Sequence, residues 1–158
     1  MFTLNGLKAF HNWTHSTLDV LFDHLEAMPE ALLSEELDGF GFASIRAQVV
    51  HLLLCELHWL GRLQGQDLLP RGDEPRNVAD FRALKRRAAE ATARYLAGLT
   101  DEGLSVEVAM LEPDGTSMGG TPAKVMHHVL THAFHHKGQV VAMCRLLGHP
   151  APETDLLV

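Results

Sequence analysis

Four long stretches of the sequence carry apolar residues at spacings of three and four. They cover residues 4–28, 44–64, 78–99 and 122–147. This spacing gathers the apolar side chains on one side of an α-helix, and that side must pack against other helices. Ser44, Asn77 and Thr121 are favourable N-cap residues at the start of the last three stretches. The pattern predicts an all-α fold, a four-helix bundle.

The connections between these stretches differ in length. Residues 65–76 are polar and include two prolines, and when extended they could span about 40 Å, which exceeds the length of about 30 Å of a 20-residue helix. The second and third helices therefore need not be antiparallel neighbours. Residues 104–110 alternate apolar and polar side chains, with a turn sequence at 112–115 before residues 116–120. This part predicts a short hairpin or an ordered loop before the fourth helix.

Length and charge limit the classes of protein that this chain can represent. Its 158 residues suit one domain, which we expect to span residues 1–158. The net charge of −7 argues against a nucleic-acid partner, because phosphate binding needs basic residues. No apolar run is long enough to cross a membrane, and no secretory signal is visible. Cys55 and Cys144 are isolated in apolar runs, which is typical of reduced thiols in the cytoplasm.

Histidine is unusually frequent, with 11 residues in the chain. His128, His132 and His136 follow one another at intervals of four, which places them in one column on a helix. Two imidazoles at such a spacing can bind one metal ion. His51 lies within an apolar run of the second stretch and is the best third ligand. Three histidines are typical of a catalytic divalent metal site. The alternative is a set of buried histidines that are hydrogen-bonded within the core.

The segments around these histidines match a known pattern. They are residues 44–46 and 56–60 around His51, Lys137-Gly138-Gln139 after His136, and residues 146–150. Together they resemble the DinB/YfiT-like superfamily of metal-dependent enzymes, from about Phe10 to Leu156. The resemblance implies an up-down-down-up bundle and a homodimer. It also implies a divalent metal, zinc or nickel, on His51, His132 and His136.

The resemblance also suggests a reaction. Relatives include S-transferases that use bacillithiol or mycothiol and a mycothiol-dependent maleylpyruvate isomerase, and others are called hydrolases. We therefore expect a metal-dependent thiol S-transferase or hydrolase that acts on a small molecule, with a low-molecular-weight thiol as a candidate cofactor. The alternative is a non-catalytic, metal-binding structural or stress-response dimer. Nothing in this resemblance implies DNA binding.

Several further residues are candidates for roles around the metal. Gln139, one turn after His136, could hydrogen-bond a ligand or bound water. Glu56 could orient a histidine or act as a general base, or it could form an ion pair on the helix surface. His128 could line the cavity. His11 and His15, again four residues apart, could border the cavity or bind a second ion.

Three other side chains have simpler expectations. Cys55 is a candidate thiolate ligand four residues after His51, although a small buried apolar role is the more ordinary interpretation. Lys137 is expected to make a surface or interface contact. Arg46, near the start of the second helix, could reach an anionic cofactor.

Overall fold

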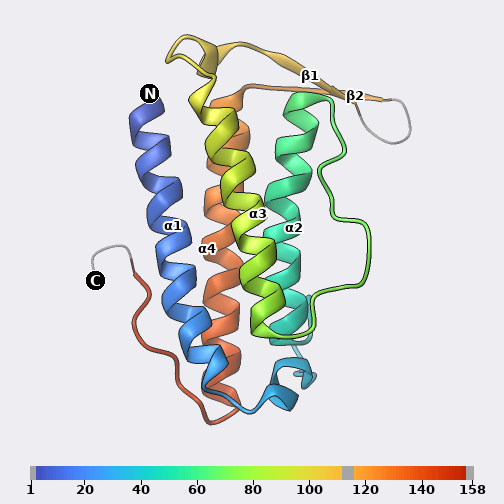
Figure 1. Cartoon of the computed structure of the whole chain (residues 1–158), viewed down its shortest axis with the longest axis vertical. Helices are drawn as coiled ribbons and strands as arrows, with labels where there is room; N and C mark the ends of the chain where they lie inside the picture. Colours follow the sequence, from blue (N-terminus) through green and yellow to red (C-terminus); the bar gives the residue numbers. More distant parts are fainter. Residues whose placement is uncertain (1–2, 112–115, 156–158) are drawn as a thin grey trace.

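Four α-helices form a bundle within residues 3–111 and 116–155, the part of the chain that the computed structural model describes (Figure 1). The helices are α1 (Leu4–Glu26), α2 (Ile45–Gln64), α3 (Val78–Ala97) and α4 (Pro122–Leu146). Two short 3-10 helices, η1 (Glu30–Ser34) and η2 (Gly103–Ser105), lie in the connections of this described part. The all-α prediction is confirmed.

The helices begin at the expected capping residues. Ser44 and Thr121 each accept a hydrogen bond from a backbone N–H through the side-chain hydroxyl, and Asn77 forms a capping box with Asp80. Two helices end two residues earlier than predicted, α1 before Ala27 and α3 before Gly98. The residues that follow bond to carbonyls three positions back, so each helix tightens into a final turn before the chain leaves.

The bundle has the up-down-down-up order implied by the resemblance. Helix α1 packs against α3 and α4, and α2 packs against the same two helices, so α1 and α2 face each other across the diagonal. Helices α2 and α3 run parallel, because residues 65–77 carry the chain back along the outside of the bundle (Figure 1).

The predicted hairpin lies over one end of the bundle (Figure 1). Strands β1 (Val108–Leu111) and β2 (Ser117–Gly120) pair antiparallel, with Val108 opposite Gly120. The turn sequence at residues 112–115 lies outside the described residues. Met110 reaches down from β1 and packs with Leu63 and Val125, so the hairpin is fixed to α2 and to the start of α4.

The core also contains polar side chains. Its largest apolar cluster is built around Phe22, Leu53 and Phe81, and a smaller one around Leu7 and Leu130. Buried polar side chains come from every helix: His11, Thr14, His15, Gln48, Glu56, Thr92, His136 and Lys137. Buried polar groups must be paired, so specific contacts are expected among these residues. No described helix is long and apolar enough to cross a membrane.

Candidate metal centre

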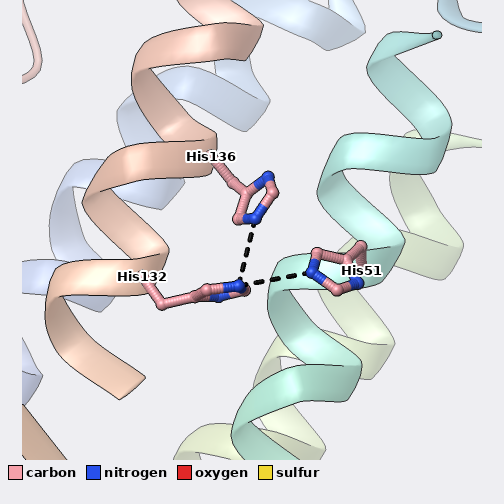
Figure 2. A group of neighbouring side chains, drawn as sticks. All are labelled: His51, His132 and His136. Atoms are coloured by element: carbon pink, nitrogen blue, oxygen red, sulfur yellow. Dashed lines mark hydrogen bonds between the residues drawn. The ribbon is translucent and has the colours of Figure 1, made fainter. Parts of the chain in front are cut away.

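Three histidines converge between α2 and α4 (Figure 2). Nε2 of His132 lies 3.3 Å from Nε2 of His51 and 3.1 Å from Nε2 of His136. One nitrogen from each ring lies within 4.8 Å of the other two. His136 is buried, whereas His51 and His132 are half-buried. The structure thus brings together the three histidines that the sequence selected, one from α2 and two from successive turns of α4.

Gln48 fixes the orientation of one ring. The Nδ1–H of His136 donates to Oε1 of Gln48 at 2.5 Å, which leaves the Nε2 lone pair directed at the other two histidines. Gln48 is itself held, because its amide donates to the carbonyl of Phe42 at 2.8 Å and to Oε1 of Gln139 at 2.6 Å. Gln139 therefore acts on His136 through Gln48 and contacts the exposed His135 with its own amide, at 2.6 Å.

Sequence reasoning missed Gln48. The side chain is completely buried on the apolar side of α2, three residues before His51. A glutamine among apolar residues at that position was the available signal, since a buried amide needs a polar partner.

The environment keeps the three rings neutral. Burial, followed by repulsion from neighbouring histidines, lowers the pKa of His132 and of His136 to about 4. Burial also lowers the pKa of His51. Neutral imidazoles present lone pairs, and lone pairs that face one another at about 3 Å repel unless a proton or a cation lies between them. The group is therefore compatible with metal binding, and imidazole donors suit zinc and nickel alike.

An aromatic ring covers part of this group. Phe42 stacks on His51 with ring centroids 4.0 Å apart, and meets His136 edge-on at 5.8 Å. Phe42 lies in the segment before α2, where sequence analysis assigned no role. Its ring covers one side of His51 and of His136.

His128 lies between the three histidines and an apolar pocket. Its ring centroid is 5.4 Å from that of His132 and 5.3 Å from that of Trp59. The pocket opens under the hairpin and is lined by Trp59, Met110, Met118, Gly119, Gly120, Lys124, Val125 and His128. His128 does not belong to the converging group, and it lines a pocket whose lining includes none of the three histidines.

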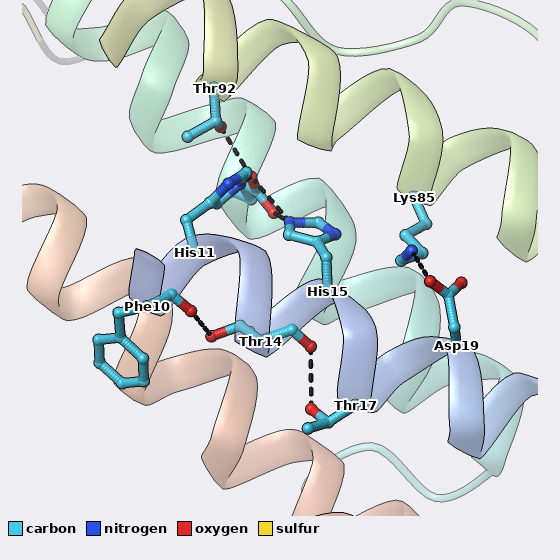
Figure 3. Close-up of polar contacts among 9 residues, drawn as sticks. Phe10, His11, Thr14, His15, Thr17, Asp19, Lys85 and Thr92 are labelled. Atoms are coloured by element: carbon cyan, nitrogen blue, oxygen red, sulfur yellow. Dashed lines mark hydrogen bonds and ion pairs between the residues drawn. The ribbon is translucent and has the colours of Figure 1, made fainter. Parts of the chain in front are cut away.

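Glu56 and His15 occupy a different place. Glu56 is buried, so the interpretation as a surface ion pair is wrong. Its carboxylate accepts hydrogen bonds from His11 Nε2 at 2.9 Å, His15 Nε2 at 3.1 Å and Thr92 Oγ1 at 2.7 Å (Figure 3). Burial alone raises the pKa of Glu56, but the hydrogen bonds and charges of His11 and His15 outweigh it and hold that pKa well below its usual range. These partners belong to α1 and α3, whereas the partners of His51 are on α4.

A family model described as the DinB family matches residues 1–158. The chain belongs to the DinB family. This confirms the resemblance found in the sequence. Protein DinB of Bacillus subtilis is 26% identical over 159 aligned residues, which cover 94% of this chain and 88% of that protein.

Two solved structures share the fold of this DinB-family chain. A DinB-like protein from Bacillus cereus superposes with a TM-score of 0.65 at 20% identity, covering 97% of this chain and 99% of that one. A DinB family member from Shewanella denitrificans gives a TM-score of 0.62 at 18% identity, covering 99% and 89%. At these sequence identities the similarity shows that the fold is shared, and it says nothing about function.

Two further residues of the DinB-family chain, Cys55 and Lys137, lie outside the three-histidine group. Cys55 is half-buried, lies outside both histidine groups of the described residues, and has a pKa raised to about 11 by burial. A thiolate ligand is therefore disfavoured at this position. Lys137 is not a surface residue as expected: it is buried and donates to Thr17 Oγ1 at 3.2 Å and to the carbonyl of Thr154. The segment after α4 folds back over it.

Proposed function

We infer that this DinB-family protein is a divalent-metal-dependent enzyme in which His51, His132 and His136 hold zinc or nickel. The observation that carries the proposal is the convergence of three neutral imidazole nitrogens, with the tautomer of His136 set by Gln48. A set of three protein ligands rather than four is typical of a catalytic site, because a position is left for water or substrate.

The proposed chemistry is nucleophilic. A bound divalent metal lowers the pKa of a coordinated thiol or water, so that the nucleophile forms near neutral pH. With a thiol of the bacillithiol or mycothiol type the protein would be an S-transferase, and with water it would be a hydrolase. Family membership and the donor set support both reactions equally.

The chain's own side chains have distinct parts in this proposal. Gln48 holds the ring of His136 in place, and Phe42 shields His51 and His136 from water. The apolar pocket that His128 and Trp59 border would receive a small substrate with an apolar group. Lys124 at its rim would favour a substrate that also carries a negative charge. We further propose a cytoplasmic homodimer.

Metal analysis tests the first part of the proposal. The purified wild-type chain should hold about one equivalent of zinc or nickel at the three histidines, and His132→Ala and His136→Ala should lose it. His58→Ala, which removes an exposed histidine of α2, is the matched control and should keep it. Unchanged metal content in both α4 variants would refute the assignment of the ligands.

A reaction panel tests the second part. The metal-loaded protein is incubated with small electrophiles and esters, each with bacillithiol, mycothiol, glutathione or no thiol. We expect conjugation or hydrolysis that disappears with His132→Ala. If the protein binds metal at the three histidines but turns over nothing in the panel, the alternative of a non-catalytic structural or stress-response dimer is favoured. Light scattering would establish whether it is a dimer.

A further inference from the structure

A second group of metal-ligating side chains lies in the core and has no part in the proposed reaction. His11 and His15 extend from successive turns of α1 (Figure 3). Glu56 reaches them from α2, across the diagonal of the bundle. Glu56 follows His51 by five residues, which turns it about 140° around α2 and away from α4. The two groups are therefore built on opposite sides of the same helix.

The donor atoms of this second group are already close together. The Nε2 atom of His11 lies 2.9 Å from Oε1 of Glu56, and the Nε2 atom of His15 lies 3.1 Å from Oε2 and 3.3 Å from Oε1. One donor atom from each residue lies within 4.8 Å of the others. Ligands that share a tetrahedral metal at about 2.1 Å are themselves about 3.4 Å apart, so these donor atoms need to separate only slightly to admit an ion.

We propose that His11, His15 and Glu56 form a second divalent-metal site, separate from the three-histidine centre. Two imidazoles four residues apart on one helix and a carboxylate from another helix are a donor set that zinc and similar transition metals accept. We do not expect magnesium or calcium at this site, because both metals prefer oxygen ligands and two of the three residues offer imidazole nitrogen. Both oxygens of Glu56 face His15, so a bidentate carboxylate would bring the donor atoms to four.

The surroundings supply what such a site needs. The Oγ1 hydroxyl of Thr92 donates to Oε1 of Glu56 at 2.7 Å, the kind of contact that orients a ligating carboxylate. The Nδ1 atom of His15 has no hydrogen-bond partner among the described residues, so moving the ring proton from Nε2 to Nδ1 on metal binding would break no existing contact at Nδ1. A surface groove lined by His11, His15, Asp19 and Glu90, among others, gives an ion a route between α1 and α3.

The position of this site points to a structural role. All three ligands are buried, and the apolar pocket beside His128 is bordered by other residues. A metal here would tie α1 to α2, two helices that otherwise face each other only across the diagonal, and would hold α3 through Thr92. An ion that binds the folded chain alone raises its stability by mass action.

The decisive experiment removes the first site and keeps the second. The full chain with His51→Ala, His132→Ala and His136→Ala is stripped with a chelator and titrated with cobalt and then zinc. We expect about one equivalent to bind, with visible cobalt absorption, and the Tm to rise by about 5 °C or more. Adding His15→Ala or Glu56→Gln should abolish this binding, whereas adding His58→Ala should leave it unchanged.

Two outcomes would overturn the proposal. One is a triple variant that circular dichroism shows to be folded but that binds no cobalt or zinc. His11, His15 and Glu56 would then be a hydrogen-bonded network without a metal. The other is binding that survives both His15→Ala and Glu56→Gln. If the triple variant does not fold, zinc-soaked crystals of the wild-type chain decide: an anomalous peak between His15 and Glu56 supports the site, and its absence refutes it. Because the triple variant lacks the first site, neither result depends on the proposed function.

Discussion

The ring of His136 donates its Nδ1–H to Oε1 of Gln48, a side chain that α2 buries completely. This contact joins the two helices that supply the three histidines, and it settles which nitrogen of His136 faces them. It also links the centre to Gln139, because Gln48 in turn donates to that amide. If the three imidazoles bind a metal as proposed, this buried hydrogen bond orients one of the ligands.

The first prediction concerns Gln48. Gln48→Leu removes the acceptor but keeps the volume roughly constant, so His136 is free to rotate or to change tautomer. We expect metal affinity to fall by about 10-fold to 100-fold, measured by competition with a chromophoric chelator. Gln48→Glu, which retains an acceptor for Nδ1–H, should lose less. Equal affinity in Gln48→Leu and the wild-type chain would show that this bond does not orient the ring.

The second prediction concerns pH. The pKa of His132 and of His136 is about 4 in the folded chain and has the ordinary value of 6.5 when unfolded. Between these values the unfolded chain binds more protons, so the metal-free protein should lose stability as the pH falls from about 7.5 to about 5. Thermal denaturation in chelator measures this. The double variant His132→Ala and His136→Ala should depend less on pH over the same range, and a flat wild-type profile would contradict the assignment.

The third prediction concerns Lys137. Its ammonium group holds the segment after α4 through the carbonyl of Thr154, and lies 4.0 Å from the ring centroid of Phe134. Lys137→Met should leave that carbonyl without its buried partner and cost about 2 kcal/mol of unfolding free energy. Denaturant titration gives the loss, and faster hydrogen exchange in residues 149–155 would locate it. The exposed Lys124→Met is the control, and we expect it to change stability little.

The fourth prediction concerns the apolar pocket. Met118 lines it from β2 and is 44% exposed, so a larger side chain can be added there without disturbing the core. Met118→Trp should raise KM for the substrate found in the reaction panel by about 10-fold and leave metal content unchanged. Leu146→Trp, at an exposed position at the end of α4, is the control. Unchanged KM in Met118→Trp would place the substrate elsewhere.

Local sequence patterns were sufficient to predict the helices and part of the candidate metal site. The N-caps at Ser44, Asn77 and Thr121 could be predicted from the residues next to them in the sequence. In the structure α2, α3 and α4 begin directly after these residues. The pairing of His132 with His136 is equally local, because the pitch of a helix places residues four apart on one face. The ends of α1 and α3 were less predictable, since the last turn of a helix tightens in ways that propensity does not specify.

The sequence by itself therefore determined the helices, the bundle class and the two histidines that α4 brings together. His51 was selected as their neighbour from its place in an apolar run of the second helix, and the family resemblance implied the same ligand. Only the tertiary structure decided that Gln48 orients His136, that Glu56 joins His11 and His15 across the bundle, and that Lys137 is buried. These contacts join residues between 17 and 88 positions apart. The physical reason is that helical periodicity fixes which residues share a face, whereas the partner of each face depends on how the helices pack.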